Sequence, residues 1–206
     1  MIISKSKAYR NEIDGIRALA VIAVIINHFN STLLKGGYLG VDIFFVISGY
    51  VITLSAASKR NEGFLNFIFN FYERRIRRLI PALIFFVLIT GIFICFFNPS
   101  PGVHLKTGIS SLFGLSNIFL LSQSTDYFSQ SSDLNPFTHT WSLGVEEQFY
   151  FLFPFLLWFS GYASKKNNGI RNLLFLNSFF SIISFFLFIF LFAKSQNIVY
   201  FLMPAR

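Results

Sequence analysis

Long apolar runs, separated by short charged stretches, constrain this chain more than any other feature of its sequence. A helix needs about 20 residues to cross about 30 Å of hydrocarbon, and several runs reach that length. Because lipid offers no water to a polar backbone, helices are the expected form of such runs. We therefore predict an all-α, polytopic transmembrane bundle. Its spans are expected at about residues 16–34, 38–57, 79–97, 140–162 and 173–193.

A further apolar run, residues 109–121, is too short to cross the membrane as a helix. It contains several small or polar residues, among them Ser110, Gly114 and Asn117. Irregular or polar backbone at membrane depth is tolerated where protein or a cavity surrounds it. This run therefore favours a re-entrant or interfacial helix over another span.

Composition supports lipid as the solvent and excludes several other classes. Charged residues make up 13% of the chain, against about 25% in soluble domains, and Phe alone supplies 30 of the 206 residues. The single cysteine, Cys95, excludes an internal disulfide and a multi-cysteine metal site. The net charge of +8 could suggest nucleic acid, but the basic residues flank apolar runs, so no nucleic-acid partner is expected.

The basic residues also predict the orientation. Most of them fall on one side of the predicted spans, which by the positive-inside rule makes the N-terminus cytoplasmic. The segment of residues 98–139 is then an external polar loop. The basic residues on the opposite side are Lys35, Lys106, Lys194 and Arg206.

Ionisable side chains within the spans are candidates for a functional site, because each is costly at membrane depth unless it is paired or solvated. They are Arg17, His28, Asp42, Glu146 and Glu147. Arg17 and His28 are eleven residues apart on one predicted helix. That spacing puts them within about 20° of one face, with a rise of about 16 Å between them.

His28, Asp42 and Glu147 are expected at a similar depth, in the outer half of the membrane. An imidazole beside a carboxylate is a general-base arrangement, in which the carboxylate fixes the tautomer. A structural His–Asp hydrogen bond is the simpler alternative, and a purely structural scaffold is another. The same groups could also form the relay of a proton-coupled transporter. We expect no cation other than His28 near the two adjacent carboxylates.

Four arginines, Arg74, Arg75, Arg77 and Arg78, form a basic cluster at the cytoplasmic end of the predicted third span. Such a cluster often does no more than contact anionic lipid. Arginine also suits bidentate binding of phosphate, so the cluster could instead hold an anionic ligand. A proton-coupled transporter would not need a site for an anionic ligand.

Four sequence stretches together resemble the acyltransferase-3 family of membrane acyltransferases. The first begins EIDGIRALA at residue 12 and contains the family's spacing of ten residues between Arg17 and His28. The second is GVDIFFVISGY at residues 40–50, and the third is FYERRIRRLIP at residues 71–81. The fourth is NPFTHTWSLGVEEQFY at residues 135–150. Their order and intervals match the family over nearly the whole chain.

The resemblance implies transfer of an acyl group, usually acetyl from cytoplasmic acetyl-CoA, to a glycan hydroxyl. Family members modify lipopolysaccharide O-antigen, peptidoglycan and exopolysaccharides in the cell envelope. The resemblance assigns catalysis to His28, Asp42, Glu146 and Glu147, with no metal. It assigns donor binding to a set of arginines: Arg17, Arg74, Arg75, Arg77 and Arg78.

The family also implies a multi-pass protein of the inner (cytoplasmic) membrane, with lipid and a glycan acceptor as partners. Its domain usually has more spans than this chain supplies, so residues 1–206 are expected to form a partial domain. The sequence leaves open whether His28 acts as a general base or is itself acylated. It also leaves the oligomeric state open.

Overall fold

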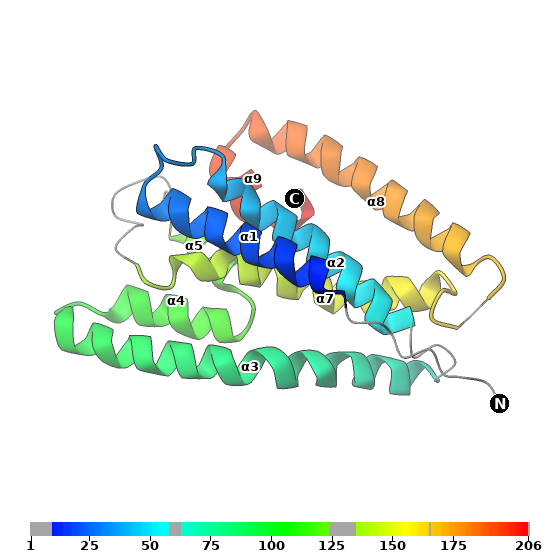
Figure 1. Ribbon diagram of the computed structural model, residues 1–206, viewed down its shortest axis with the longest axis horizontal. Coiled ribbons are helices and arrows are strands. Elements are labelled where there is room, and N and C mark those ends of the chain that lie inside the picture. The colour runs from blue at the N-terminus through cyan, green and yellow to red at the C-terminus, as the bar shows by residue number, and fades with distance from the viewer. Residues whose placement is uncertain (1–9, 58–62, 124–134, 165, 206) are drawn as a thin grey trace. The chain divides into compact units, whose positions relative to one another are not determined.

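The computed structural model describes residues 10–57, 63–123, 135–164 and 166–205. Every regular element in these ranges is a helix, which confirms the all-α prediction (Figure 1). The chain divides into two compact units, Met1–Ser55 and Ala56–Arg206, which are described separately.

The first unit is a helical hairpin. Helix α1 covers Asn11–Phe29, a short 3-10 helix η1 covers Gly37–Leu39, and α2 covers Gly40–Ala57. α1 therefore ends at Phe29 rather than at the predicted residue 34. The cause is local: the Asn30 side chain accepts hydrogen bonds from the Thr32 backbone N–H (2.9 Å) and hydroxyl (2.6 Å), which favours a turn over another helical turn.

Two glycines allow the two arms of this hairpin to touch. A Cβ on Gly37 would collide with the Ala23 carbonyl oxygen, and one on Gly40 would collide with the Ala20 carbonyl oxygen. Glycine is the only residue that fits where a backbone approaches this closely, and small residues serve the same purpose in membrane helix pairs. The Asn27 side chain also donates to the Leu34 carbonyl (2.8 Å), which ties the connecting turn to α1.

The second unit is built on α3, which covers Phe64–Phe97 and is longer than the predicted span 79–97. It starts early because the preceding residues are apolar and pack against α7, which covers Trp141–Phe159. Phe64 and Phe67 lie 5.3 Å and 5.9 Å from the Trp158 ring, measured between centroids. The Tyr72 hydroxyl adds a hydrogen bond to the Phe151 carbonyl (2.7 Å). The basic cluster consequently lies within a continuous helix rather than at a helix end.

The short apolar run 109–121 forms no single helix, in agreement with the prediction that it does not cross. Helix α4 covers Gly102–Leu112 and α5 covers Ser116–Ser122. Between them Gly114 has a φ of 66°, in the left-handed region that favours glycine. α4 packs against α3, so the described part of segment 98–139 is largely helical, and the expected polar loop is wrong there.

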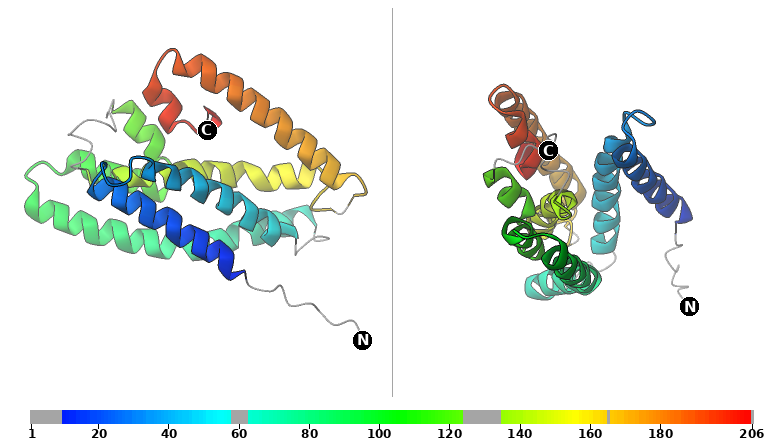
Figure 2. Two further views of the ribbon diagram at one scale, coloured as in Figure 1. Left: turned by 45° about the horizontal axis from the view of Figure 1, so that its top comes forward. Right: turned by 90° about the vertical axis from the view of Figure 1, so that its left-hand side faces the viewer.

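The rest of the second unit consists of η2 (Thr138–Thr140), α8 (Gly169–Phe192), α9 (Gln196–Phe201) and η3 (Met203–Ala205). α8 runs along the edge of this unit, and α9 and η3 fold back onto it (Figure 2). Most side chains of α8 are apolar and exposed, which suits a lipid environment.

Three helical segments are long and apolar enough to cross a membrane: Gly37–Ala56, Phe64–Phe97 and Gly169–Phe192. They correspond to the predicted spans 38–57, 79–97 and 173–193. α1 and α7 are shorter and carry acidic residues. Their crossing, and with it the total of five spans and the cytoplasmic N-terminus, stays a prediction.

The close approach of the hairpin arms predicts that Gly40→Ala destabilises the first unit. The added Cβ must push α2 away from the backbone of α1, at a cost of about 1–3 kcal/mol. Gly49 is the matched control, because a Cβ there meets no atom within 4 Å. Gly49→Ala should leave thermal stability in detergent unchanged or raise it by about 0.5–1 kcal/mol. Equal unfolding midpoints for the two variants would contradict the packing described.

Candidate functional site

His28 lies in the last turn of α1, and a hydrogen bond fixes its tautomer. Its Nδ1 lies 2.8 Å from the Val24 carbonyl oxygen. A carbonyl can only accept, so Nδ1 carries the hydrogen, and in the neutral ring Nε2 is the basic nitrogen. The exposed imidazole therefore has the tautomer that a general base or a nucleophile needs at Nε2.

Arg17 lies about three turns earlier on the same helix and is mostly buried, with its side chain 20% exposed. One Nη contacts the Asp14 carboxylate at 3.4 Å, and the guanidinium lies 6.0 Å from the centre of the Phe44 ring. Its Nε is buried and has no hydrogen-bond partner among the described residues. Buried N–H groups are normally bonded, so Arg17 retains a donor for an anionic ligand.

Asp42 is half-buried in the first turn of α2. Gly40 packs against Ala20, and the Phe44 ring is the one that lies by Arg17. Asp42 therefore lies beside the middle of α1, between the levels of Ala20 and Arg17 along the helix axis. Ala20, which marks the level of Gly40, precedes His28 by eight residues, a rise of about 12 Å along α1. Direct pairing of Asp42 with His28 stays a prediction.

In the second unit, Arg75 and Glu146 are joined through Tyr150. The Arg75 guanidinium carbon lies 4.0 Å from the centre of the Tyr150 ring, a close cation–π contact. The Tyr150 hydroxyl donates a hydrogen bond to Glu146 Oε1 at 2.9 Å. Arg75 is thus linked to Glu146 through Tyr150, and the expectation that no cation other than His28 lies near the carboxylates stays a prediction. α7 packs along the first half of α3, which places the basic cluster level with the carboxylates.

The other arginines of the cluster differ in their surroundings. Arg77 pairs with Glu73 at 2.7 Å on an exposed surface, and Arg78 is also exposed. Arg74 is half-buried, and its Nη1 is buried with no hydrogen-bond partner in the described part of the chain. Arg74 therefore has a donor directed into the protein, whereas Arg77 already has a carboxylate.

Glu147 is half-buried beside the turn between α4 and α5. Its carboxylate lies against Gly114, where a Cβ would collide with Oε2. Glu147 forms no hydrogen bond or ion pair with any residue that the structure describes. Glu147 thus differs from Glu146, whose orientation is set by Tyr150.

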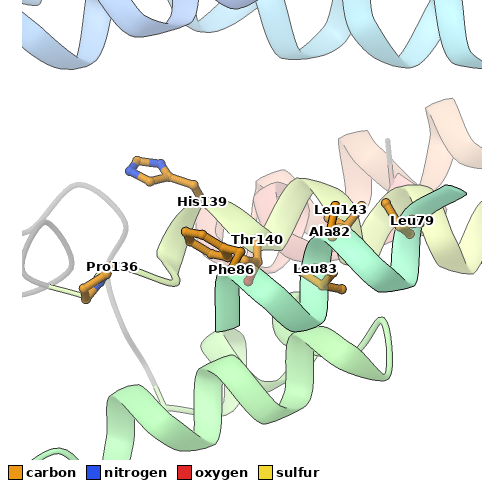
Figure 3. A pocket seen from close by; sticks show the side chains of 8 residues that line it. All are labelled: Leu79, Ala82, Leu83, Phe86, Pro136, His139, Thr140 and Leu143. Carbon is orange, nitrogen blue, oxygen red and sulfur yellow. The ribbon is translucent and has the colours of Figure 1, made fainter. Parts of the chain in front are cut away.

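An open apolar pocket of about 350 Å³ lies between α3 and the start of α7 (Figure 3). Leu79, Ala82 and Phe86 line it from α3, at spacings that continue the helix face of Arg75. His139 stands at its rim with the ring turned away from the apolar side chains. The remaining lining residues are Leu83, Pro136, Thr140 and Leu143.

The predicted site residues divide between the two units. Arg17, His28 and Asp42 belong to the first unit, while the basic cluster, Glu146 and Glu147 belong to the second. The meeting of His28 with Glu147 therefore stays a prediction. Among the described residues, no three His, Cys, Asp or Glu side chains come together as metal ligands.

Comparison with known proteins identifies the family. A family model described as an acyltransferase domain matches residues 10–204. The chain belongs to this acyltransferase family. O-acetyltransferase OatA from Staphylococcus aureus is 42% identical over 169 residues, covering 82% of this chain and 28% of that relative. Peptidoglycan O-acetyltransferase OatA from Listeria monocytogenes is 43% identical over 158 residues, covering 75% and 25%. No solved structure shows a significant match.

The acyltransferase chain thus spans about a quarter of the length of these curated relatives. The match includes all four stretches on which the resemblance rested, because residues 10–204 contain each of them. The similarity therefore covers both units and every predicted site residue.

Sequence reasoning missed three residues of the acyltransferase chain that organise the carboxylates: Tyr150, Gln148 and Asn117. Asn117 is fully buried and donates to the Phe201 carbonyl (2.9 Å). Gln148 donates to the Asn117 side-chain oxygen (2.8 Å) and to the Gly114 carbonyl (3.1 Å). These three residues are polar side chains within apolar runs, which marks them in the sequence. Polarity alone does not predict which residues they bond.

This buried network predicts the effect of Asn117→Ala. The substitution removes the Asn117 hydrogen bond to the buried Phe201 carbonyl and one of the two acceptors of the Gln148 amide, which costs about 1–3 kcal/mol. Ser122→Ala, at the exposed end of the same helix, should change stability by no more than about 0.5 kcal/mol. Thermal unfolding of the detergent-solubilised protein measures both. An Asn117 variant as stable as the Ser122 variant would show that the network does not hold α5, α7 and α9 together.

Proposed function

We propose that this chain forms the part of a membrane O-acyltransferase that binds an acyl-CoA donor and activates the acceptor hydroxyl. Family membership supports the reaction class. The observation that carries the proposal is the tautomer of His28, whose Nδ1–H is bonded to Val24 so that Nε2 is the basic nitrogen. A proton relay in a transporter could use the same groups, but the family match favours the enzyme.

The donor's phosphates would bind Arg74 and Arg75 of the basic cluster, since Arg77 already pairs with Glu73. Arg74 supports this role because a buried N–H on its Nη1 has no partner in the described residues. Arginine binds phosphate through short, charge-assisted hydrogen bonds. Under the predicted orientation this cluster faces the cytoplasm, where acetyl-CoA is available. Arg17, with its buried Nε, would provide a second contact nearer to His28.

His28 would act on the acceptor hydroxyl. Nε2 takes the hydroxyl proton, the oxygen attacks the thioester carbonyl, and the carbon–sulfur bond breaks. The proton then passes from the imidazolium to the departing sulfur, which leaves as the thiol. Direct acylation of Nε2, followed by transfer to the hydroxyl, would use the same nitrogen. Asp42 or Glu147 would stabilise the imidazolium.

Peptidoglycan is the proposed acceptor class. The Listeria monocytogenes relative is named a peptidoglycan O-acetyltransferase. The three long apolar helices place such a reaction at a membrane, and the bacterial cytoplasmic membrane is the one beside this polymer. The acyl group is then acetyl, as the names of these O-acetyltransferase relatives indicate.

Equilibrium binding of coenzyme A to the detergent-solubilised protein tests the donor site. Arg74→Ala should weaken binding by about tenfold or more, because a charge-assisted hydrogen bond to phosphate is lost. Arg77→Ala is the matched control, since Arg77 already pairs with Glu73, and it should stay within about twofold of wild type. Binding should weaken as salt rises. No measurable binding by the wild-type protein, or equal effects of the two variants, would contradict the assignment.

A further inference from the structure

Tyr150 contacts both the basic cluster and the carboxylate pair: the Arg75 guanidinium lies on its ring face, and its hydroxyl donates to Glu146. It is buried, with 7% of its surface exposed. Tyr150 and Glu146 are four residues apart on α7, whereas Arg75 comes from α3. The ring therefore bridges two helices as well as two charged groups.

The Tyr150 ring supports Arg75 through a cation–π contact, which is compatible with phosphate binding by the guanidinium. A guanidinium stacked on an aromatic face is held through its π-surface, while its N–H groups lie in the plane of the group. Bidentate binding of a phosphate uses those in-plane N–H groups. An aromatic support thus presents Arg75 in a form suited to the diphosphate end of a coenzyme.

The hydroxyl extends this arrangement to Glu146. A carboxylate can only accept, so the Tyr150 O–H must donate, and this fixes one oxygen of Glu146 at 2.9 Å. Any shift of Arg75 toward a bound phosphate would act on the same ring that orients the carboxylate. Phosphate binding at Arg75 and the orientation of Glu146 are then coupled, and the coupling free energy acts equally in both directions.

We infer that Tyr150 is a positioning residue that couples binding of the donor's diphosphate at Arg75 to the orientation of the Glu146 carboxylate. This inference rests on the proposed function, because it takes the basic cluster as the donor site. Tyr150 is not among the site residues predicted from the sequence, and its ring and its hydroxyl have separate roles. The ring supports donor binding, and the hydroxyl supports the transfer step.

Two substitutions separate these tasks. Tyr150→Phe keeps the ring and removes the hydroxyl, so coenzyme A affinity should stay within about twofold while the rate of acetyl transfer falls about tenfold. Tyr150→Leu removes the ring as well, so affinity should also weaken about tenfold. Coenzyme A binding by the solubilised protein and acetyl transfer in membranes carrying the whole protein provide the two readouts.

Two neighbouring residues serve as controls. Tyr72→Phe removes a hydroxyl from the same α3–α7 contact, and Phe149→Leu removes a ring next to Tyr150 that stacks on Phe153. Neither should change affinity or rate by more than about twofold once the amount of folded protein is matched. If the controls match the Tyr150 variants, the role of Tyr150 is only structural and the inference is overturned.

The remaining outcomes also test the role of Tyr150. A Tyr150→Phe variant with wild-type turnover would remove the link to Glu146, and wild-type affinity in Tyr150→Leu would remove the link to Arg75. If Tyr150→Leu does not fold, Tyr150→Phe alone tests the inference, through an unchanged coenzyme A affinity and a lower transfer rate. If the wild-type protein binds no coenzyme A, the proposed function fails. Normal wild-type binding that is lost in Arg74→Ala but unchanged in both Tyr150 variants overturns this inference alone.

Discussion

The packing of α7 along the first half of α3 is the contact on which the second unit depends. Phe64 and Phe67 pack on Trp158, and the Tyr72 hydroxyl bonds the Phe151 carbonyl. The ring contacts set the register between the two helices, and the Tyr72 hydrogen bond forms within that register. In that register Arg75 contacts the Tyr150 ring, and the basic cluster lies at the same level of the helix pair as the carboxylates. Aromatic packing thus determines which charged groups meet.

In the first unit a close backbone contact has the same role. Gly37 and Gly40 let η1 and α2 approach α1 at Ala23 and Ala20. This contact sets where Asp42 stands relative to His28 and Arg17, before any charge interaction is considered. His28 itself is oriented by its own helix, through the Val24 carbonyl. The nitrogen proposed to act in catalysis is therefore defined by local geometry within α1.

The sequence predicts the helical class, the three long apolar helices and the candidate ionisable residues, because length, hydropathy and buried charge are local properties. It did not predict that α3 begins at Phe64, because the apolar residues before Arg74 were not counted as part of the span. The sequence predicts the depth of Glu146 from the end of its span. It does not predict which residues surround Glu146, because these depend on α3–α7 contacts between residues nearly eighty positions apart. The role of Tyr150 follows from that register and has no local signature.

We propose that donor binding and chemistry use separate residues, with His28 as the group that acts on the reacting atoms. His28→Ala in the whole protein tests this, with acetyl transfer to peptidoglycan and coenzyme A binding measured on the same preparation. We expect a loss of transfer of about 100-fold or more, with binding within about twofold of wild type. Transfer near the wild-type rate in the His28 variant would contradict it.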